Sequence, residues 1–400
     1  MFRKCSRHYP EQMATARFLH AADLHLGSPL KSLGNAIGDA ELQRFKQLVN
    51  GAFDRLVQTA IDEQVDFVVL AGDVYDTAER DPGAQRRFLL GLRRLTKTGI
   101  RVFMVHGNHD PLTKNIKDGL VPEGVVVFPA GKLGVETIKM RNGAEVVVAG
   151  VSYSKTEEDK NLVPLFAGLS GKTIVGVLHT NVGGNTQHGN YAPCSVNDLE
   201  QSPVNYWALG HIHLRTVKQT PRGWWAYPGN LQGRSAKAAE TGPKGVLIVD
   251  VDEAGSISEP RFVECSTVRF ARVDVEVDRV AEVGGVDDQV VAQLQTLVSE
   301  SGGLPHLVRL ELTGQTDIAA LLDSPKWDRQ QTLAEGNQAL DGGAIVKLEF
   351  SCVPRVDLAE QRTRGTLLGT VLNELDKEEI TDDIREAATS LLVNTLGAHQ

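Results

Sequence analysis

Short apolar runs typical of buried strands recur along the first two thirds of the chain. Each run is rich in Val, Ile, Leu, Ala or aromatic residues and ends at a polar cluster or a glycine. The five clearest predicted strands are 17–22, 67–71, 102–106, 173–178 and 206–209. Further strands are predicted across 124–150 and 224–263, as a second sheet would require.

Longer segments with helical periodicity separate the first of these runs. In 41–64 and 82–98, apolar residues such as Phe45, Leu48, Leu56 and Ile61 recur every three or four positions. Alternation of strands and helices predicts an α/β fold, here a β-sandwich flanked by helices.

The pattern changes near residue 267. Strands are predicted at 268–277, 307–313 and 344–350, and helices at 287–299 and 317–334, which together form a small α/β domain. After Pro354 two amphipathic helices are predicted, divided near residues 380–382. Their apolar positions are Leu367, Leu368, Val371, Leu372 and Leu375, then Ile384, Ala387, Leu391, Leu392 and Leu396.

These patterns predict four segments: an N-terminal extension (1–16), a first domain (17–266), a second domain (267–354) and C-terminal helices (355–400). Since the first strand begins near Arg17, we expect residues 1–12 to be flexible and Met13 to be an alternative start. The second domain could cover a functional site of the first domain or could have only a structural role. The terminal helices could bind a partner or pack on the second domain.

Composition is typical of a soluble enzyme. The chain has 400 residues, 41% of them hydrophobic, which is enough for two or three cores. No apolar run approaches the roughly 18 residues of a membrane span, and the N-terminus lacks the apolar stretch of a secretory signal, so we expect a cytoplasmic protein. The four cysteines stand far apart without a C-x-x-C pair, which favours reduced thiols.

Polar clusters with metal-ligand chemistry follow the five clearest strands. Parallel strands direct their carboxyl ends to one edge of a sheet, so residues far apart in sequence can meet there. The candidates are Asp23 and His25; Asp73; Asn108, His109 and Asp110; His179; and His211 with His213.

The spacing inside the clusters has a physical reason. Side chains at i and i+2 of an extended segment leave on the same face, so Asp23 and His25 could grip a metal pair together, as could His211 and His213. Asn108 and His109 should point apart, which leaves one as a ligand and the other for proton transfer. Glycines at 72, 107 and 210 permit tight turns.

Carboxylate, imidazole and amide donors without thiolate favour manganese, iron or zinc in a site of five or six ligands. Two divalent ions with Asp23, Asp73 and a hydroxide would leave a charge of roughly +1, suited to an anionic phosphodiester. The residues therefore predict hydrolysis by in-line attack of a metal-activated water.

The ordered set of clusters resembles the calcineurin-like metallophosphoesterase superfamily, and the surrounding sequence resembles the SbcD/YhaO-type DNA repair exonucleases. The resemblance is strong over 17–265 and weak beyond. The segments that carry it are FLHAADLHL (18–26), AGDVYD (71–76), VHGNHD (105–110), HGNYAPC (188–194), YWALGHIH (206–213) and YPGNLQGR (227–234).

The resemblance implies two divalent ions, manganese above all, bridged by Asp73. It implies one ion on Asp23, His25, Asp73 and His213, and a second on Asp73, Asn108, His179 and His211. His109, oriented by Asp110, would stabilise the transition state or protonate the leaving oxygen. Where eukaryotic and archaeal relatives have a further histidine this chain has Asp76, as bacterial members do, so no such role carries over.

Two more residues are candidate substrate contacts. His188 lies in a Gly/Asn-rich loop and could contact substrate or be a solvated loop histidine. Arg234 could bind a backbone phosphate through two parallel hydrogen bonds from its guanidinium group, or it could be an ordinary surface residue.

We therefore expect a manganese-dependent DNA nuclease, a 3′ to 5′ exonuclease with some single-strand endonuclease activity. The resemblance implies an SbcC-like, SMC-type ATPase partner, and a homodimer is left open. A net charge of −9 implies weak binding of DNA by this chain alone.

Three alternatives remain open at this point. The first is a stand-alone phosphodiesterase or phosphatase acting on nucleotides or small esters. A protein serine/threonine phosphatase is disfavoured because the Asp-Arg-Gly run of that family does not follow Gly72-Asp73. An inactive scaffold is disfavoured because no ligand of the expected set is missing.

Overall fold

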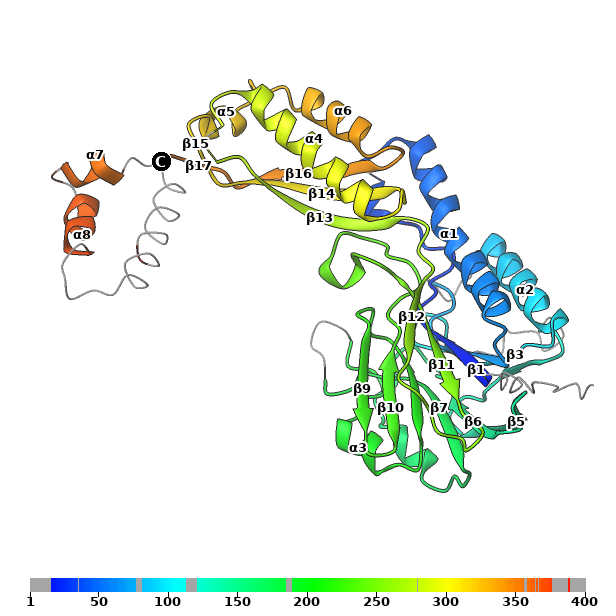
Figure 1. Cartoon of the computed structure of the whole chain (residues 1–400). Coiled ribbons are helices and arrows are strands. Elements are labelled where there is room, and N and C mark those ends of the chain that lie inside the picture. Colours follow the sequence, from blue (N-terminus) through cyan, green and yellow to red (C-terminus); the bar gives the residue numbers. More distant parts are fainter. Residues whose placement is uncertain are drawn as a thin grey trace, which may run out of the picture. The chain divides into compact units, whose positions relative to one another are not determined.

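The computed structural model describes residues 16–34, 36–76, 81–112, 121–184, 189–278, 280–355, 358–363, 365, 367–375 and 388. The chain divides into two compact units, with the main division between Arg269 and Phe270; the short segment Asn35–Ile37 is grouped with the second unit. Figure 1 shows the helices and strands of both units. Residues 1–15 of the expected N-terminal extension lie outside the described residues, and Ala16 already belongs to the first strand.

A six-stranded sheet in the first unit carries three of the five predicted strands. Its order is β12-β11-β1-β2-β3-β4. From β1 to β4 the strands are parallel, whereas β11 is antiparallel to β1 and β12 to β11. The bounds are β1 (Ala16–Ala21), β2 (Phe67–Ala71), β3 (Arg101–Val105), β4 (Val125–Val127), β11 (Gly245–Val251) and β12 (Arg261–Glu264).

A second six-stranded sheet, with order β5-β6-β7-β8-β10-β9, carries the other two predicted strands. Its four central strands are parallel, and β5 and β9 pair antiparallel at the edges. The bounds are β5 (Gly134–Lys139), β6 (Glu145–Val151), β7 (Thr173–His179), β8 (Tyr206–Gly210), β9 (Thr216–Thr220) and β10 (Gly223–Tyr227). The expectation that 124–150 and 224–263 both belong to this sheet was wrong in part, because β4, β11 and β12 extend the first sheet.

Apolar side chains fill the space between the two sheets. Phe18 of β1 stacks on Phe67 of β2 with ring centroids 4.8 Å apart, and Tyr206 of β8 meets Phe18 edge-on. Along β1 the alternate residues Leu19 and Ala21 face the opposite way, into a core shared with two helices. This alternation explains why β1 is buried on both faces.

Helices α1 (Asp39–Asp62) and α2 (Pro82–Lys97) supply the helical side of that core. Helix α2 begins where Asp81 accepts a hydrogen bond from the Ala84 amide and Pro82 occupies the first turn, a favourable N-terminus. On the second sheet, the short helix η2 (Val163–Phe166) places Phe166 against Trp207. A β-sandwich flanked by helices is therefore observed, as predicted.

The second unit contains a three-stranded sheet of order β13-β14-β16, with bounds Arg269–Glu276, His306–Thr313 and Ala344–Phe350. Helices α4 (Val283–Glu300) and α6 (Arg329–Ala339) pack against each other beside it. The single helix predicted at 317–334 was wrong. The chain forms α5 (Ala319–Leu322), turns through Ser324-Pro325, and restarts at α6, whose first turn Asp328 caps.

Strands β15 (Gln315–Thr316) and β17 (Val353–Pro354) pair in a separate two-stranded sheet. Beyond them the structure describes α7 (Leu358–Thr363) and α8 (Leu367–Leu375), where Leu372 is fully buried. The helix predicted over 384–396 lies outside the described residues apart from residue 388. None of the helices in the described part of the chain has the length and apolar character of a membrane span.

Candidate metal centre

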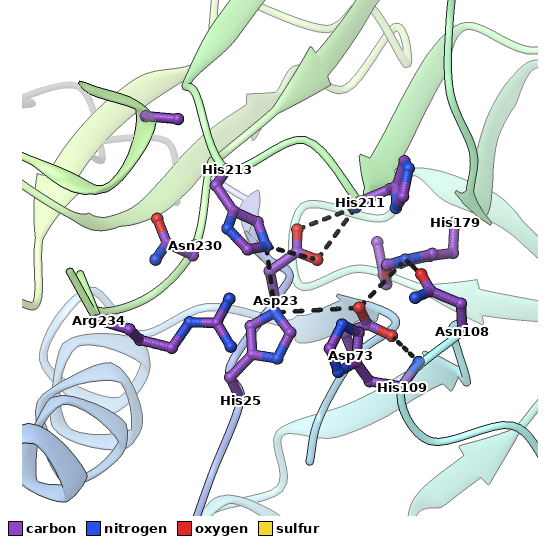
Figure 2. A network of polar contacts seen from close by, with 12 residues as sticks. Asp23, His25, Asp73, Asn108, His109, His179, His211, His213, Asn230 and Arg234 are labelled. Carbon is purple, nitrogen blue, oxygen red and sulfur yellow. Dashed lines mark hydrogen bonds and ion pairs between the residues drawn. The ribbon is translucent and has the colours of Figure 1, made fainter. Parts of the chain in front are cut away.

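The predicted ligands converge at one edge of the sandwich in the first unit (Figure 2). Because β1, β2 and β3 are parallel neighbours, the loops after them emerge together, and the parallel strands β7 and β8 do the same in the second sheet. Three sets of donor atoms lie within 4.8 Å of one another: Asp23, His25 and His213; His25, Asp73 and His109; and Asp23, Asp73 and His179.

One group of donors surrounds His25. Its Nε2 lies 3.1 Å from Nε2 of His213 and 3.9 Å from Oδ2 of Asp73. Nε2 of His213 lies 3.9 Å from Oδ1 of Asp23. All four side chains are buried, so they form a closed cluster rather than a solvated surface group.

A second group surrounds His179. Its Nε2 lies 3.4 Å from the same Oδ2 of Asp73 and 3.0 Å from Oδ1 of Asn108. Asp73 thus stands between the two groups, in the place expected of a bridging ligand. The His211 ring lies 5.2 Å from the His179 ring, but its Nε2 contacts the carbonyl oxygen of Gly189 at 2.7 Å.

Hydrogen bonds on the outer ring nitrogens indicate which nitrogens can bind a cation. Nδ1 of His213 lies 2.7 Å from a carboxylate oxygen of Glu240, and Nδ1 of His179 donates to the Ala71 carbonyl oxygen at 2.9 Å. With Nδ1 of His213 donating to Glu240, the lone pair on Nε2 of His213 faces Nε2 of His25 at 3.1 Å. Facing acceptors repel one another unless a cation lies between them, so the donor set fits divalent ions.

The charges in this cluster depend on each other. Although burial by itself raises the pKa of Asp73, His179 holds that pKa well below its usual range. Burial lowers the pKa of His179, yet Asp73 and Asp23 outweigh it and raise the pKa to about 9. Without a cation His179 therefore holds a proton at neutral pH. Binding a divalent ion would release that proton.

The backbone of the site is held in unusual conformations. Asp23, His25 and Asp73 have φ values of 50°, 45° and 50°, and His211 has 103°. Residues with a Cβ rarely adopt positive φ, and such strain concentrates at functional sites. We expected Asp23 and His25 to lie on the same face of an extended segment. That expectation of an extended backbone was wrong, because both residues have left-handed φ values.

Glycines allow the loops to pack this closely. Gly72 has φ of 92°, and a Cβ there would lie 2.4 Å from Nδ1 of His179. At Gly107 a Cβ would lie 2.3 Å from Oδ1 of Asp73, and at Gly210 it would lie 1.9 Å from the Ala71 carbonyl oxygen. Gly107 and Gly210 are thus required for space rather than for the turns expected from the sequence.

His109 is held by two hydrogen bonds. Its amide donates to Oδ1 of Asp73 at 2.9 Å, and its ring Nδ1 donates to the Asp76 carbonyl oxygen at 2.7 Å. The ring stands edge-on to His25, 4.8 Å away. The expected contact with Asp110 is not found among the described residues. Asp110 instead accepts from the Val74 and Gly107 amides and pairs with His106, which ties two site loops together.

An outer layer of carboxylates was missed by the sequence reasoning. Glu240 contacts His213, accepts from Asn230 at 2.7 Å and accepts from the Arg234 amide at 2.9 Å. Asp76 lies 3.3 Å from Nδ1 of His25 and pairs with the Arg234 guanidinium. Arg234 also reaches Glu240 at 3.4 Å, so both arms of its side chain contact this layer.

No local signal marks Glu240, which follows His213 by 27 residues outside every quoted motif. Asn230 could have been predicted from the YPGNLQGR segment. That segment begins at the end of β10, and β10 is the parallel neighbour of β8, the strand that leads to His211 and His213. His188, the other candidate substrate contact, lies outside the described residues.

Two protein-family models match the chain. One, described as calcineurin-like phosphoesterase, matches residues 16–215, which include Asp23 through His213. The other, described as the middle domain of metallophosphoesterase YhaO, matches residues 270–352 in the second unit.

Three curated relatives match between 66% and 91% of the chain. The chain is 30% identical over 372 residues to a Bacillus subtilis (strain 168) protein named uncharacterized metallophosphoesterase YhaO, covering 91% of this chain and 88% of that protein. It is 27% identical over 355 residues to the DNA double-strand break repair protein Mre11 of Aeropyrum pernix, covering 84% and 80%. Mre11 of Archaeoglobus fulgidus is 25% identical over 288 residues, covering 66% and 62%. The chain therefore belongs to the calcineurin-like phosphoesterase family, as a metal-dependent phosphoesterase similar along most of its length to YhaO.

Proposed function

We propose that this chain is a manganese-dependent DNA nuclease that acts as a 3′ to 5′ exonuclease and, more weakly, as an endonuclease on single strands. The observation that carries the proposal is the likeness to a DNA double-strand break repair protein over 84% of the chain, a share too large to be confined to the first unit. An enzyme for small esters has less need of a second unit.

The proposed ligands are Asp23, His25, Asp73 and His213 for one ion and Asp73, Asn108, His179 and His211 for the other. Two divalent ions held there would polarise the phosphate and activate a water for in-line attack. Donors of carboxylate, imidazole and amide type suit manganese, and they also suit iron or zinc.

His109 is the proposed proton donor. Because its Nδ1 donates to the Asp76 carbonyl oxygen, the ring is fixed and Nε2 remains for a proton. That proton would stabilise the charge of the transition state or pass to the leaving oxygen. Asp110 supports His109 indirectly, through its bonds to the Gly107 amide and to His106.

The proposal includes a cytoplasmic setting and an SbcC-like, SMC-type ATPase as partner of the C-terminal helices. A homodimer is compatible with it. The second unit is proposed to restrict which DNA ends reach the site.

One experiment tests the substrate class. Purified protein with manganese is assayed side by side on labelled single-stranded DNA, labelled duplex DNA and a small chromogenic phosphodiester, with metal content measured and Asp73→Asn as the inactive control. We expect manganese-dependent DNA cleavage that the control lacks. Turnover of the small ester without cleavage of either DNA would favour the stand-alone phosphodiesterase instead.

A further inference from the structure

The solvent side of helix α2 is strongly positive in a chain with a net charge of −9. The helix spans Pro82–Lys97 and contains four arginines and one lysine but no acidic residue. Phe88, Leu92 and Leu95 are buried against the core, so the cations occupy the rest of its circumference. Arg86, Arg93 and Lys97 are exposed.

These three cations share one face. Arg93 follows Arg86 by seven residues and Lys97 follows Arg93 by four, which are spacings of one helical face. Their side chains have no hydrogen bond or ion pair within the described part of the chain. The other two arginines differ, because Arg87 pairs with Asp54 and Arg94 donates to Gln58 at 2.9 Å.

Helix electrostatics explain only part of this arrangement. Cations in the last turn, such as Lys97, are favoured by the helix dipole. Arg86 lies in the second turn, where the helix dipole does not favour a cation. A shallow groove of ≈ 430 Å³ lies past the end of α2 and is lined by Arg93 and Lys97, by Glu123, and by Arg101, which is paired with Glu136.

The first turn of α2 lies beside a loop of the metal centre. A Cβ placed on Gly27, two residues after His25, would lie 3.1 Å from Cβ of Asp81 and 3.2 Å from Cβ of Ala84. The first turn of α2 therefore packs on the loop that follows His25. From Arg86 to Lys97 the helix rises about 16 Å. Along that distance one DNA strand presents roughly five phosphates.

We propose that Arg86, Arg93 and Lys97, which we name the α2 basic stripe, bind the phosphate backbone of the nucleic acid while its scissile phosphate occupies the metal centre. The inference rests on the proposed nuclease function and adds the surface that holds the polymer. Arginine and lysine contacts to phosphate carry no sequence information, so the stripe strengthens binding of any sequence.

The test compares two triple variants. The first replaces Arg86, Arg93 and Lys97 with Gln, which forms helices about as well as Arg or Lys. The matched control replaces Lys139, Lys218 and Arg222 with Gln; all three are exposed and lie on strands or turns of the first unit, and the change in net charge is the same. Binding of labelled duplex DNA is measured by fluorescence anisotropy in EDTA at several salt concentrations.

We expect the slope of log affinity against log salt to become shallower by about 0.9 for each lost phosphate contact in the stripe variant, and to stay near wild type in the control. Hydrolysis of a small chromogenic phosphodiester should be unchanged in both, which also shows that the stripe variant is folded. If the triple variant fails to fold, each single Gln variant should lower the slope by about 0.9.

An unchanged salt slope in a folded stripe variant would overturn the proposal. A changed sedimentation coefficient with an unchanged slope would also overturn it, because the stripe would then contact a second copy of the chain. Failure of the nuclease proposal gives a different result from failure of the stripe proposal. In that case wild-type protein would hydrolyse the small ester but would not cleave DNA.

Discussion

At the residue scale, the candidate site brings the proposed proton donor His109 close to the proposed metal ligands. His109 shares a donor cluster with His25 and Asp73, and its Nδ1 donates to a backbone carbonyl oxygen, which leaves Nε2 for a proton or a metal. Asn108, its neighbour, lies against His179. The sequence expectation that these two side chains point apart is consistent with this geometry, whereas the expected support of His109 by Asp110 is replaced by contacts to His106 and backbone amides.

His109→Ala separates catalysis from metal binding. If His109 acts on the transition state, the variant should keep both metals and lose about 10²- to 10⁴-fold in rate, the scale of general acid catalysis. Elemental analysis and turnover of a small phosphodiester measure the two effects. A metal content reduced by one ion would instead make His109 a ligand, which its closeness to His25 and Asp73 permits.

Glu240→Gln tests the outer carboxylate layer. In Glu240 one carboxylate oxygen contacts Nδ1 of His213, and the other accepts from Asn230 and the Arg234 amide. A glutamine has a single acceptor oxygen and therefore cannot make both sets of contacts. We expect about 10- to 100-fold weaker manganese binding at one of the two sites, the usual effect of losing such a partner. Isothermal titration with manganese measures it, and the control is Glu136→Gln, a surface partner of Arg101. Equal affinity at both sites would leave Glu240 a purely structural residue.

At the scale of elements, local patterns located most strands but could not assign them to sheets. The run at 67–71 was predicted with its observed bounds, because its five buried residues are apolar and Gly72 ends it. Pairing of β11 with β1 joins residues more than 200 positions apart, and no local periodicity carries that information. The helix predicted at 317–334 failed where Pro325 breaks the hydrogen-bond pattern.

Strand β1 also places an ionisable group between the sheets. His20 is fully buried and lies 3.0 Å from the Tyr206 hydroxyl of β8. Burial lowers the pKa of His20 to about 3, although a backbone hydrogen bond opposes the change. Since the unfolded chain has the ordinary histidine pKa near 6.5, the stability from neutral His20 is fully present above that pH and is lost as pH falls toward 3.

His20→Gln should therefore flatten the acid dependence of stability. Between pH 7 and pH 5 the neutral histidine accounts for about 2 kcal/mol of unfolding free energy, at 1.36 kcal/mol for each pH unit below 6.5. Urea unfolding in EDTA at both pH values, followed by near-ultraviolet circular dichroism, measures the difference. The site histidines titrate in both proteins and cancel in the comparison. Identical pH dependence in the two proteins would refute this account of His20.

At the scale of the whole molecule, the metal centre and its outer layer use residues from Asp23 to Glu240 only, all in the first unit. The candidate ligands could be proposed from the sequence because each lies at or just after the end of a recognisable strand. The contact of Glu240 with His213 could not be predicted, because Glu240 lies in a long segment between β10 and β11. The role proposed for the second unit concerns access and partners.

The C-terminal helices give the last prediction. In α8 Leu372 is fully buried within the chain, so a partner surface must use other members of the predicted apolar stripe. Replacing Leu368 and Leu375 with Glu should abolish co-purification of a co-expressed SMC-type ATPase, because a buried charge without a partner is unfavourable. Manganese-dependent hydrolysis of a small phosphodiester should remain, since every residue of the centre precedes residue 241. Loss of folding in the isolated double variant would refute the docking role, because it would place the stripe in this protein's own core.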